Sequence, residues 1–162
     1  MILKNYNQNV FVDFIALISI FLLDRVSKLY VIYLDEKLNN SEIYQSKFLN
    51  IQLIWNDGIA FGLLAFNDNL YYNSLTGIIV VVTLIVFFFM IKTKGMEKYC
   101  FMMILGGSIG NIFDRFYFSA VPDFIDIHYQ NFHWFIFNVA DIFITLGVLL
   151  LIFLELLLKK NK

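Results

Sequence analysis

Residues 10–34 read VFVDFIALISIFLLDRVSKLYVIYL, an apolar run long enough to cross a membrane although it contains four charged side chains. A helix needs roughly 20 mostly apolar residues to cross a bilayer. Three further runs, at 70–91, 99–118 and 135–158, approach or exceed that length. The sequence therefore predicts an all-α integral membrane protein with four transmembrane helices, which form a single domain over residues 1–162.

The composition supports the same class of protein. Of the 162 residues, 60% are hydrophobic and only 15% are charged, whereas about 25% are charged in ordinary soluble domains. The net charge of −1 provides no basic surface, so we expect no nucleic-acid partner. Cys100 is the only cysteine, which excludes an internal disulfide, a CxxC redox pair and a cysteine-based zinc site.

Lysine residues indicate the orientation of the helices, because Lys and Arg collect in cytoplasmic loops. Seven of the ten lysines lie before the first run, between the second and third runs or after the fourth run, at Lys4, Lys92, Lys94, Lys98, Lys159, Lys160 and Lys162, whereas Lys37 and Lys47 lie in segment 35–69. These regions share one side of the membrane if the chain crosses it four times. We therefore expect both termini to be cytoplasmic (N-in, C-in), with outer segments 35–69 and 119–134 on the extracytoplasmic face.

The first outer segment has features of its own. Residues 47–66 read KFLNIQLIWNDGIAFGLLAF, which combines β-prone residues with an Asn-Asp-Gly turn signal. The apolar stretch 59–66 is too short to span a bilayer. We expect short strands here, forming a small extracytoplasmic β-cradle between the first and second helices.

Polar side chains inside a bilayer are costly, and ionisable ones are by default candidates for a functional site. Here they lie mostly toward the outer ends of the first, third and fourth runs, at Asp24, Arg25, Lys28, Asn111, Asp114, Arg115, Asn138 and Asp141. Asp24 and Lys28 are four residues apart, which places them on one face of a helix, so we expect a structural ion pair. Hydrogen bonding between helices is an alternative explanation for each asparagine.

Three glycines, Gly106, Gly107 and Gly110, lie in the third run. Gly106 and Gly110 form a GxxxG pattern, which is typical of closely packed membrane helices. No Gly-Lys-Ser/Thr sequence follows them, so the pattern does not predict a phosphate-binding loop.

Carboxyl pairs offer one chemistry for the polar residues. Two carboxyl groups held close together cannot both ionise, so one keeps a proton. The ionised group can then take a proton from water while the protonated group polarises a peptide carbonyl. On this reasoning Asp141 is one member of the pair, and Asp114, Asp123 or Asp126 is the other. The neighbouring Arg115 favours a structural, ionised role for Asp114.

Other chemistries have less support. His128 and His133 are five residues apart and no HExxH motif is present, so we expect no metal and no cofactor. A transporter or channel subunit with proton-relaying aspartates would place polar residues along the whole depth of a helix. A membrane scaffold would leave the grouped carboxylates unexplained.

The sequence resembles the bacterial lipoprotein signal peptidase (signal peptidase II) family. The resemblance covers about residues 20–147 and rests on five motifs in order, which are DRVSK at 24–28, NDGIAF at 56–61, GGSIGNIFDR at 106–115, VPDFID at 121–126 and FNVAD at 137–141. Each motif alone would be a weak signal, but five in order on the expected topology are specific.

This resemblance implies a fold of four transmembrane helices with an outer β-cradle and a small outer helix. It also implies an aspartic endopeptidase that cuts prolipoproteins in the membrane, just before a cysteine carrying diacylglycerol, without a metal or cofactor. The implied catalytic residues are Asp123 and Asp141. Positions implied for substrate or inhibitor binding and for support of this pair are Asn56, Gly58, Asn111, Arg115 and Asn138, and a structural role is expected for Asp24, Lys28 and Asp114.

The family resemblance further implies where the protein works and what it meets. We expect a multi-pass protein of the bacterial cytoplasmic membrane, active as a monomer, with its active site on the extracytoplasmic face. Globomycin-type cyclic peptides are expected inhibitors. Pro122 departs from the family motif, which usually has an aliphatic residue there. Proline lacks an N–H donor, so a strand at this position would lose one hydrogen bond.

Overall fold

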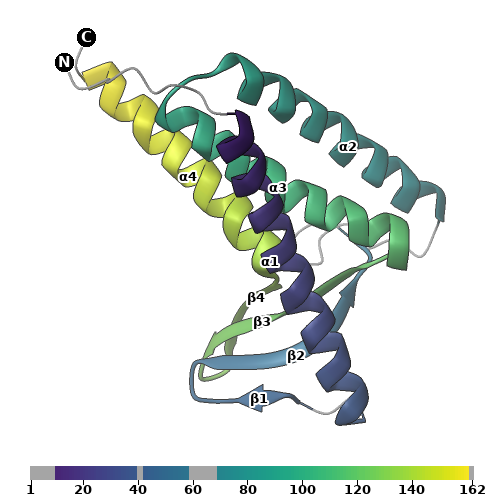
Figure 1. Cartoon of the computed structure of the whole chain (residues 1–162). Coiled ribbons are helices and arrows are strands. Elements are labelled where there is room, and N and C mark those ends of the chain that lie inside the picture. Colours follow the sequence, from purple (N-terminus) through teal and green to yellow (C-terminus); the bar gives the residue numbers. More distant parts are fainter. Residues whose placement is uncertain (1–9, 40–41, 59–68, 161–162) are drawn as a thin grey trace.

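The computed structural model describes residues 10–39, 42–58 and 69–160 as four long helices and a small sheet (Figure 1). The sheet lies at one end of the helices, and the start of the first helix and the end of the last lie at the opposite end. In chain order the elements are α1 (Val10–Lys37), β1 (Tyr44–Gln45), β2 (Leu49–Asn56), α2 (Asn69–Lys92), α3 (Met96–Phe118), β3 (Val121–Tyr129), β4 (Phe132–Phe137) and α4 (Val139–Lys160).

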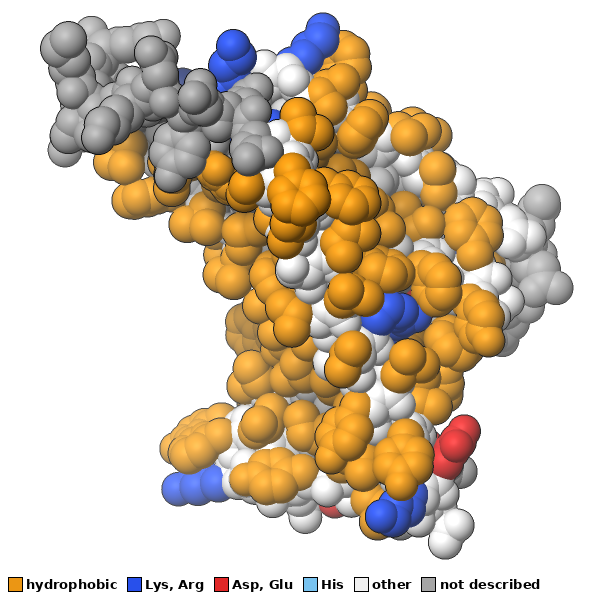
Figure 2. Space-filling view, in the orientation of Figure 1, with side chains coloured by type: hydrophobic (Ala, Val, Ile, Leu, Met, Phe, Trp, Pro, Cys, Tyr) orange, Lys and Arg blue, Asp and Glu red, His pale blue; other side chains and the backbone are white. Residues whose placement is uncertain are grey.

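The helices expose apolar side chains and bury polar ones, the reverse of a soluble protein. In α1 the buried residues include Asp24, Arg25 and Lys28, whereas Phe11 and Leu23 are exposed. Figure 2 shows hydrophobic side chains over most of one face of the helices, with most of the Lys and Arg side chains on that face toward its two ends. Such a surface suits a lipid environment, because contiguous apolar patches of this extent are rare on soluble monomers.

Within the described part of the chain, two helices are long and apolar enough to cross a membrane by composition alone. They are Tyr72–Lys92 and Val139–Leu157, with mean hydropathies of 2.8 and 2.4. The other two long helices, α1 and α3, have 28 and 23 residues. At about 1.5 Å per residue they also exceed the roughly 30 Å of a hydrocarbon core, but charged side chains lower their hydropathy.

The sheet is antiparallel in the order β1-β2-β3-β4. Its first two strands come from the segment after α1, as predicted. The prediction was wrong in placing the whole cradle there, because β3 and β4 come from the segment between α3 and α4. Residues 135–137 were assigned to the fourth helix but belong to β4. The run FHWFIF is aromatic and β-prone, and hydropathy alone does not separate such a run from a helix.

Helix ends differ from the prediction by a few residues. The first helix extends to Lys37, and the third begins at Met96, after Gly95 with a φ of 73°. The fourth begins at Val139, after β4 ends. The apolar stretch 59–66 lies outside the described residues.

Pro122 is buried in β3 opposite Trp55 of β2. Pairing between β3 and β4 begins only at Ile125. The missing N–H of the proline therefore leaves the β3–β4 pairing intact, which explains how a strand with neighbours on both sides accommodates a proline.

Glycines on α3 allow two other helices to approach it closely, as the GxxxG pattern predicted. A Cβ atom on Gly106 would lie 2.8 Å from a methyl carbon of Ile20 on α1, and one on Gly107 would lie 2.5 Å from the Ala140 carbonyl oxygen on α4. A Cβ on Gly110 would lie 2.5 Å from a carboxylate oxygen of Asp24. Small residues at these positions therefore set the spacing of α1, α3 and α4.

Replacing Gly110 by alanine should destabilise the protein. The new methyl group would collide with the buried Asp24 carboxylate, and overpacking of this kind typically costs about 1–3 kcal/mol. Gly77→Ala is the matched control, because a Cβ on Gly77 in α2 meets no atom within 4 Å and alanine favours a helix by about 1 kcal/mol over glycine. Thermal unfolding of both purified variants in detergent measures the difference. An unchanged midpoint for Gly110→Ala would contradict the packing described here.

Candidate active site

Two aspartates meet where the sheet joins the helices. Asp123 lies in β3, and Asp141 lies in the first turn of α4. The side chain of Asp123 is 2% exposed. The short link between β4 and α4 consists of Asn138 alone, so the strand and the helix N-terminus are held close together.

Asn138 contacts both carboxylates. Its side-chain Nδ2 donates to Asp123 Oδ1 at 2.5 Å, and its backbone N–H donates to Asp141 Oδ2 at 3.2 Å. Its Oδ1 in turn accepts the Asp141 backbone N–H at 3.1 Å. The two last bonds form a reciprocal N-cap, in which a capping residue and the third helical residue bind each other's backbone N–H. Asn138 was predicted inside the fourth helix, but it caps that helix instead.

Each carboxylate has a second amide donor from another element. Asn56 at the end of β2 donates to Asp123 Oδ2 at 2.8 Å, and Asn111 of α3 donates to Asp141 Oδ1 at 2.8 Å. Three asparagines therefore fix the orientation of the two carboxyl groups.

Arg115 ties the loop after β2 to α3. Its Nη2 donates to the Gly58 carbonyl at 2.8 Å and its Nη1 donates to the Asn111 carbonyl at 3.2 Å. The Gly58 backbone N–H donates to Asn56 Oδ1 at 2.9 Å. Arg115 and Gly58 thus hold the asparagine that binds Asp123.

Lys28 lies at the centre of a buried charge cluster below the two aspartates. Its Nζ donates to Asp24 Oδ2 at 2.8 Å, to Asn111 Oδ1 at 2.8 Å and to Asp114 Oδ2 at 2.6 Å. The predicted Asp24–Lys28 ion pair is present, and it is part of a larger network. Because Lys28 engages Asn111 Oδ1, the amide nitrogen of Asn111 points toward Asp141.

Asp114 and Asp24 have structural partners. Asp114 forms ion pairs with both Lys28 and Arg25, and its side chain is fully buried. Asp24 Oδ1 accepts the Ala140 backbone N–H at 2.9 Å, which ties α1 to the first turn of α4. Both carboxylate oxygens of Asp114 are engaged by cations of α1, whereas Asp123 shares Asn138 with Asp141.

Burial changes the acidity of Asp123. Removal from water, followed by the nearby negative charge of Asp141, raises the pKa of Asp123 from 3.8 to about 7. The hydrogen bonds from Asn56 and Asn138 oppose this shift because they stabilise the ionised carboxylate. The group can therefore hold a proton near neutral pH.

Asp126 and the two histidines lie apart from this pair. Asp126 Oδ2 lies 2.9 Å from His133 Nδ1, and the rings of His128 and His133 stack with centroids 5.0 Å apart. Both histidines lie in the predicted outer segment 119–134, one on β3 and the other on β4. Within the described ranges no group of three His, Cys, Asp or Glu side chains is arranged to hold a metal ion.

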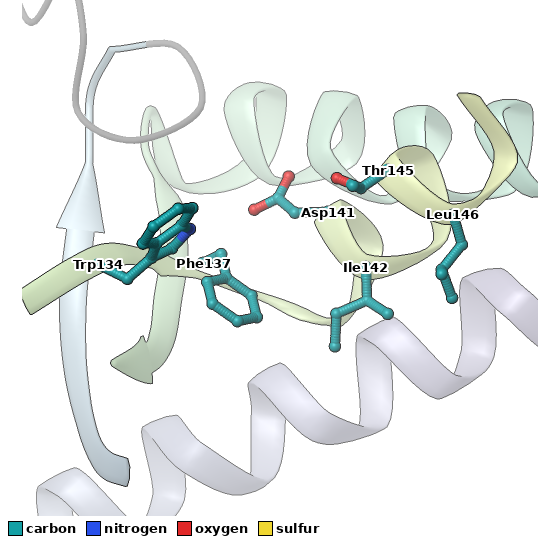
Figure 3. Close-up of a pocket in the computed structure, with 6 residues that line it drawn as sticks. All are labelled: Trp134, Phe137, Asp141, Ile142, Thr145 and Leu146. Atoms are coloured by element: carbon teal, nitrogen blue, oxygen red, sulfur yellow. The ribbon is translucent and has the colours of Figure 1, made fainter. Parts of the chain in front are cut away.

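Two hollows open beside the aspartates. The first has a volume of about 250 Å³ and is lined by Trp134, Phe137, Asp141, Ile142, Thr145 and Leu146 (Figure 3). The second, of about 390 Å³, is lined by Ile54, Trp55, Asn56, Asp57, Asp123, Trp134, Phe135 and Ile136. Asp141 thus lines one hollow and Asp123 lines the other. Trp134 lines both, and nothing in the sequence analysis had marked it as a candidate.

Sequence comparison identifies similar proteins along nearly the whole chain. The profile of the family described as Signal peptidase (SPase) II matches residues 15–157. A protein of Pelagibacter ubique named lipoprotein signal peptidase is 44% identical over 155 residues, 96% of this chain and 93% of that protein. A protein of Anaplasma phagocytophilum with the same name is 37% identical, over 90% of this chain and 92% of its own length.

Solved structures show the same fold. A bacterial membrane enzyme determined by the in meso method at 2.3 Å resolution superposes with a TM-score of 0.73 at 23% identity, over 93% of this chain and 91% of its own. A second bacterial membrane enzyme, at 1.9 Å resolution, gives a TM-score of 0.69 at 24% identity, over 96% of this chain and 98% of its own. The helices and the sheet therefore form an arrangement already known from membrane enzymes.

Lys28→Met should destabilise the protein strongly. The substitution leaves the buried carboxylates of Asp24 and Asp114 without their shared ammonium, and breaking a buried ion pair in this way typically costs about 3–5 kcal/mol. Lys98→Met is the control, since the Lys98–Asp13 pair is partly exposed and should cost less. Thermal unfolding in detergent compares the two variants. Equal losses of thermal stability in the two variants would show that burial does not determine how much the Lys28 cluster stabilises the protein.

Proposed function

The chain belongs to the signal peptidase II family, and we propose that it removes the signal peptide from diacylglyceryl-modified prolipoproteins with Asp123 and Asp141 as the catalytic pair. The observation that carries this assignment is the bonding of one residue, Asn138, to both carboxyl groups. It holds two acidic side chains together at the junction of sheet and helices. The relatives named lipoprotein signal peptidase support the choice of substrate.

In the proposed reaction Asp141 acts as the base and Asp123 as the acid. Asp141 lies in the first turn of α4, where the helix dipole favours negative charge. It takes a proton from water while the water oxygen bonds to the scissile carbonyl carbon, and Asp123 gives its proton to the carbonyl oxygen. The tetrahedral intermediate then collapses. The C–N bond breaks, the hydroxyl proton returns to Asp123, and the proton held by Asp141 passes to the leaving amine.

The surrounding amides would keep both carboxyl groups in position through these steps. Asn56 donates to Asp123, Asn111 donates to Asp141, and Asn138 donates to both. Arg115 holds the Gly58 carbonyl near Asn56, so we assign Arg115 and Gly58 to support of the pair and to binding of substrate backbone. Globomycin-type peptides would occupy the same position.

We place all four long helices across the bacterial cytoplasmic membrane. The charged residues in the middle of α1 and near the end of α3 are buried within the protein, which lowers the free-energy cost of placing them in lipid. The lysine distribution puts both termini in the cytoplasm. In Figure 1 the sheet lies at the far end of the helices from the start of α1 and the end of α4, so this topology places the catalytic pair on the extracytoplasmic face.

The lipid on the substrate would set the depth of the cut. Each buried CH₂ group of an acyl chain contributes about 0.8 kcal/mol to membrane partitioning, so the two chains of diacylglycerol hold the modified cysteine near the headgroups. The aspartates lie where the helices meet the sheet, at about that depth in the proposed topology. The enzyme then needs few further contacts with the peptide to position the bond just before the cysteine at the aspartates.

Asp123→Asn and Asp141→Asn should each abolish cleavage while the protein remains folded, because neither carboxyl group can replace the acid or base function of the other. The assay supplies the purified protein with a diacylglyceryl-modified precursor and measures release of the signal peptide. The same precursor without lipid should be cut far more slowly. Near wild-type turnover by either variant would refute the catalytic assignment.

Asp114→Asn serves as the comparison in this assay. Its carboxylate forms ion pairs with both Lys28 and Arg25, so its loss should lower thermal stability together with activity. If the Asp114→Asn variant is as stable as the wild type but inactive, the catalytic partner of Asp141 is Asp114 and not Asp123.

Activity should fall as the pH rises through about 7. The pKa of Asp123 is raised to about 7, so its carboxyl group keeps the required proton below that pH and loses it above. The basic limb of the kcat/KM profile reports this ionisation in the free enzyme. Asn56→Ala removes a hydrogen bond that stabilises the carboxylate, so its basic limb should move to higher pH. A limb that stays in place, or moves to lower pH, would contradict the role of Asp123 as the proton donor.

A further inference from the structure

The strand that carries Trp134 contains a bulge. β3 pairs His128 with His133 and Asp126 with Ile136. Two steps along β3 therefore match three steps along β4, and Trp134 and Phe135 together face one residue of β3. Bulges bend a strand and redirect side chains, and they are frequent next to active sites. The backbone of β4 is thus irregular at the position of this tryptophan.

The residue before the bulge is fixed to β3. His133 Nδ1 lies 2.9 Å from Oδ2 of Asp126, whose side chain is 1% exposed. The His133 ring also stacks on His128, whose Nε2 lies 3.1 Å from Asn50 Oδ1. These contacts hold the start of the bulge in place, so the direction of the Trp134 side chain is set by its neighbours.

Trp134 stands between the two hollows. It is the residue that their two linings share, while Asp141 belongs to one lining and Asp123 to the other. Figure 3 shows the Asp141 carboxyl group pointing toward the strand that carries Trp134. Anchoring of the sheet at the membrane interface is the usual role of such a tryptophan. That role does not account for the position of Trp134 beside both hollows.

The two hollows differ in chemistry. Beyond Asp141, the first is lined by apolar side chains and one threonine, mostly from α4. The second includes the polar side chains of Asn56, Asp57 and Asp123. The apolar signal peptide suits the first hollow, and the chain after the cut suits the second. A substrate bound across both aspartates must pass Trp134 close to the bond that is cut.

We propose that Trp134 is a specificity-determining residue, a wall between two subsites that limits the size of the side chain just before the scissile bond. This inference rests on the proposed function, in which the residue after the cut is always the lipid-modified cysteine. The residue before the cut is then the nearest one that can vary, and a large side chain there meets the indole ring.

The test compares two lipid-modified precursors that differ only in this residue, glycine in one and leucine in the other. The wild type should prefer glycine. Trp134→Ala should lower the glycine-to-leucine ratio of kcat/KM by about tenfold or more, the scale of discrimination that a few methylene groups give in a hydrophobic pocket. Trp134→Phe should lower the ratio less, because a smaller ring remains at the same position.

Tyr44→Ala is the matched control. Tyr44 lies on β1 of the same sheet and is 54% exposed, but neither lining includes it, so its loss should leave the ratio unchanged. An unchanged ratio in Trp134→Ala would overturn the proposal. So would loss of cleavage of both precursors in both Trp134 variants when thermal unfolding matches the wild type. Failure of the wild type on both precursors would instead refute the proposed function and, with it, this inference.

Discussion

The ammonium group of Lys28 is the interaction on which the rest of the site depends. It lies fully buried among Asp24, Asn111 and Asp114, contacting all three at 2.6–2.8 Å. It joins α1 to α3 and orients Asn111 toward Asp141, while Asp24 extends the network to the first turn of α4. In a bilayer no water can replace these contacts. The helices therefore assemble around a charge cluster, and the close packing at the α3 glycines follows from it.

The sequence predicted those parts of the arrangement in which charged side chains would be unfavourable in lipid without a partner. Asp24, Lys28 and Asp114 were recognisable because charge inside an apolar run requires a partner, and the i,i+4 spacing identified one pair. GxxxG predicted the close packing of α3. The capping pattern of Asn138 and Asp141 was also readable, since Asn followed three residues later by an acid is a helix-start signal. It was missed because the apolar residues 135–137 were counted as helix.

The strands were harder to predict for a physical reason. β4 is a short run of aromatic residues and isoleucine, and its hydropathy does not distinguish a strand from the start of a membrane helix. The bulge at Trp134 depends on the register between two strands, which neither strand shows by itself. From the residues alone, Asp114, Asp123 and Asp126 remained open as the partner of Asp141, because all three lie close to the same predicted helix end. The family motif favoured Asp123, and in the structure Asp123 shares Asn138 with Asp141.

The sharing of Asn138 between both carboxyl groups has a consequence for drug resistance. An inhibitor that binds the aspartates through the surrounding asparagines contacts side chains whose polar groups are already committed to the enzyme's own carboxylates. A substitution that weakened the inhibitor there would also release Asp123 or Asp141 from its position. In the proposed mechanism, such a substitution would also lower the activity of the enzyme. Compounds extended into the apolar hollow lined by Ile142 and Leu146 would give up this protection, because those side chains can change without disturbing the pair.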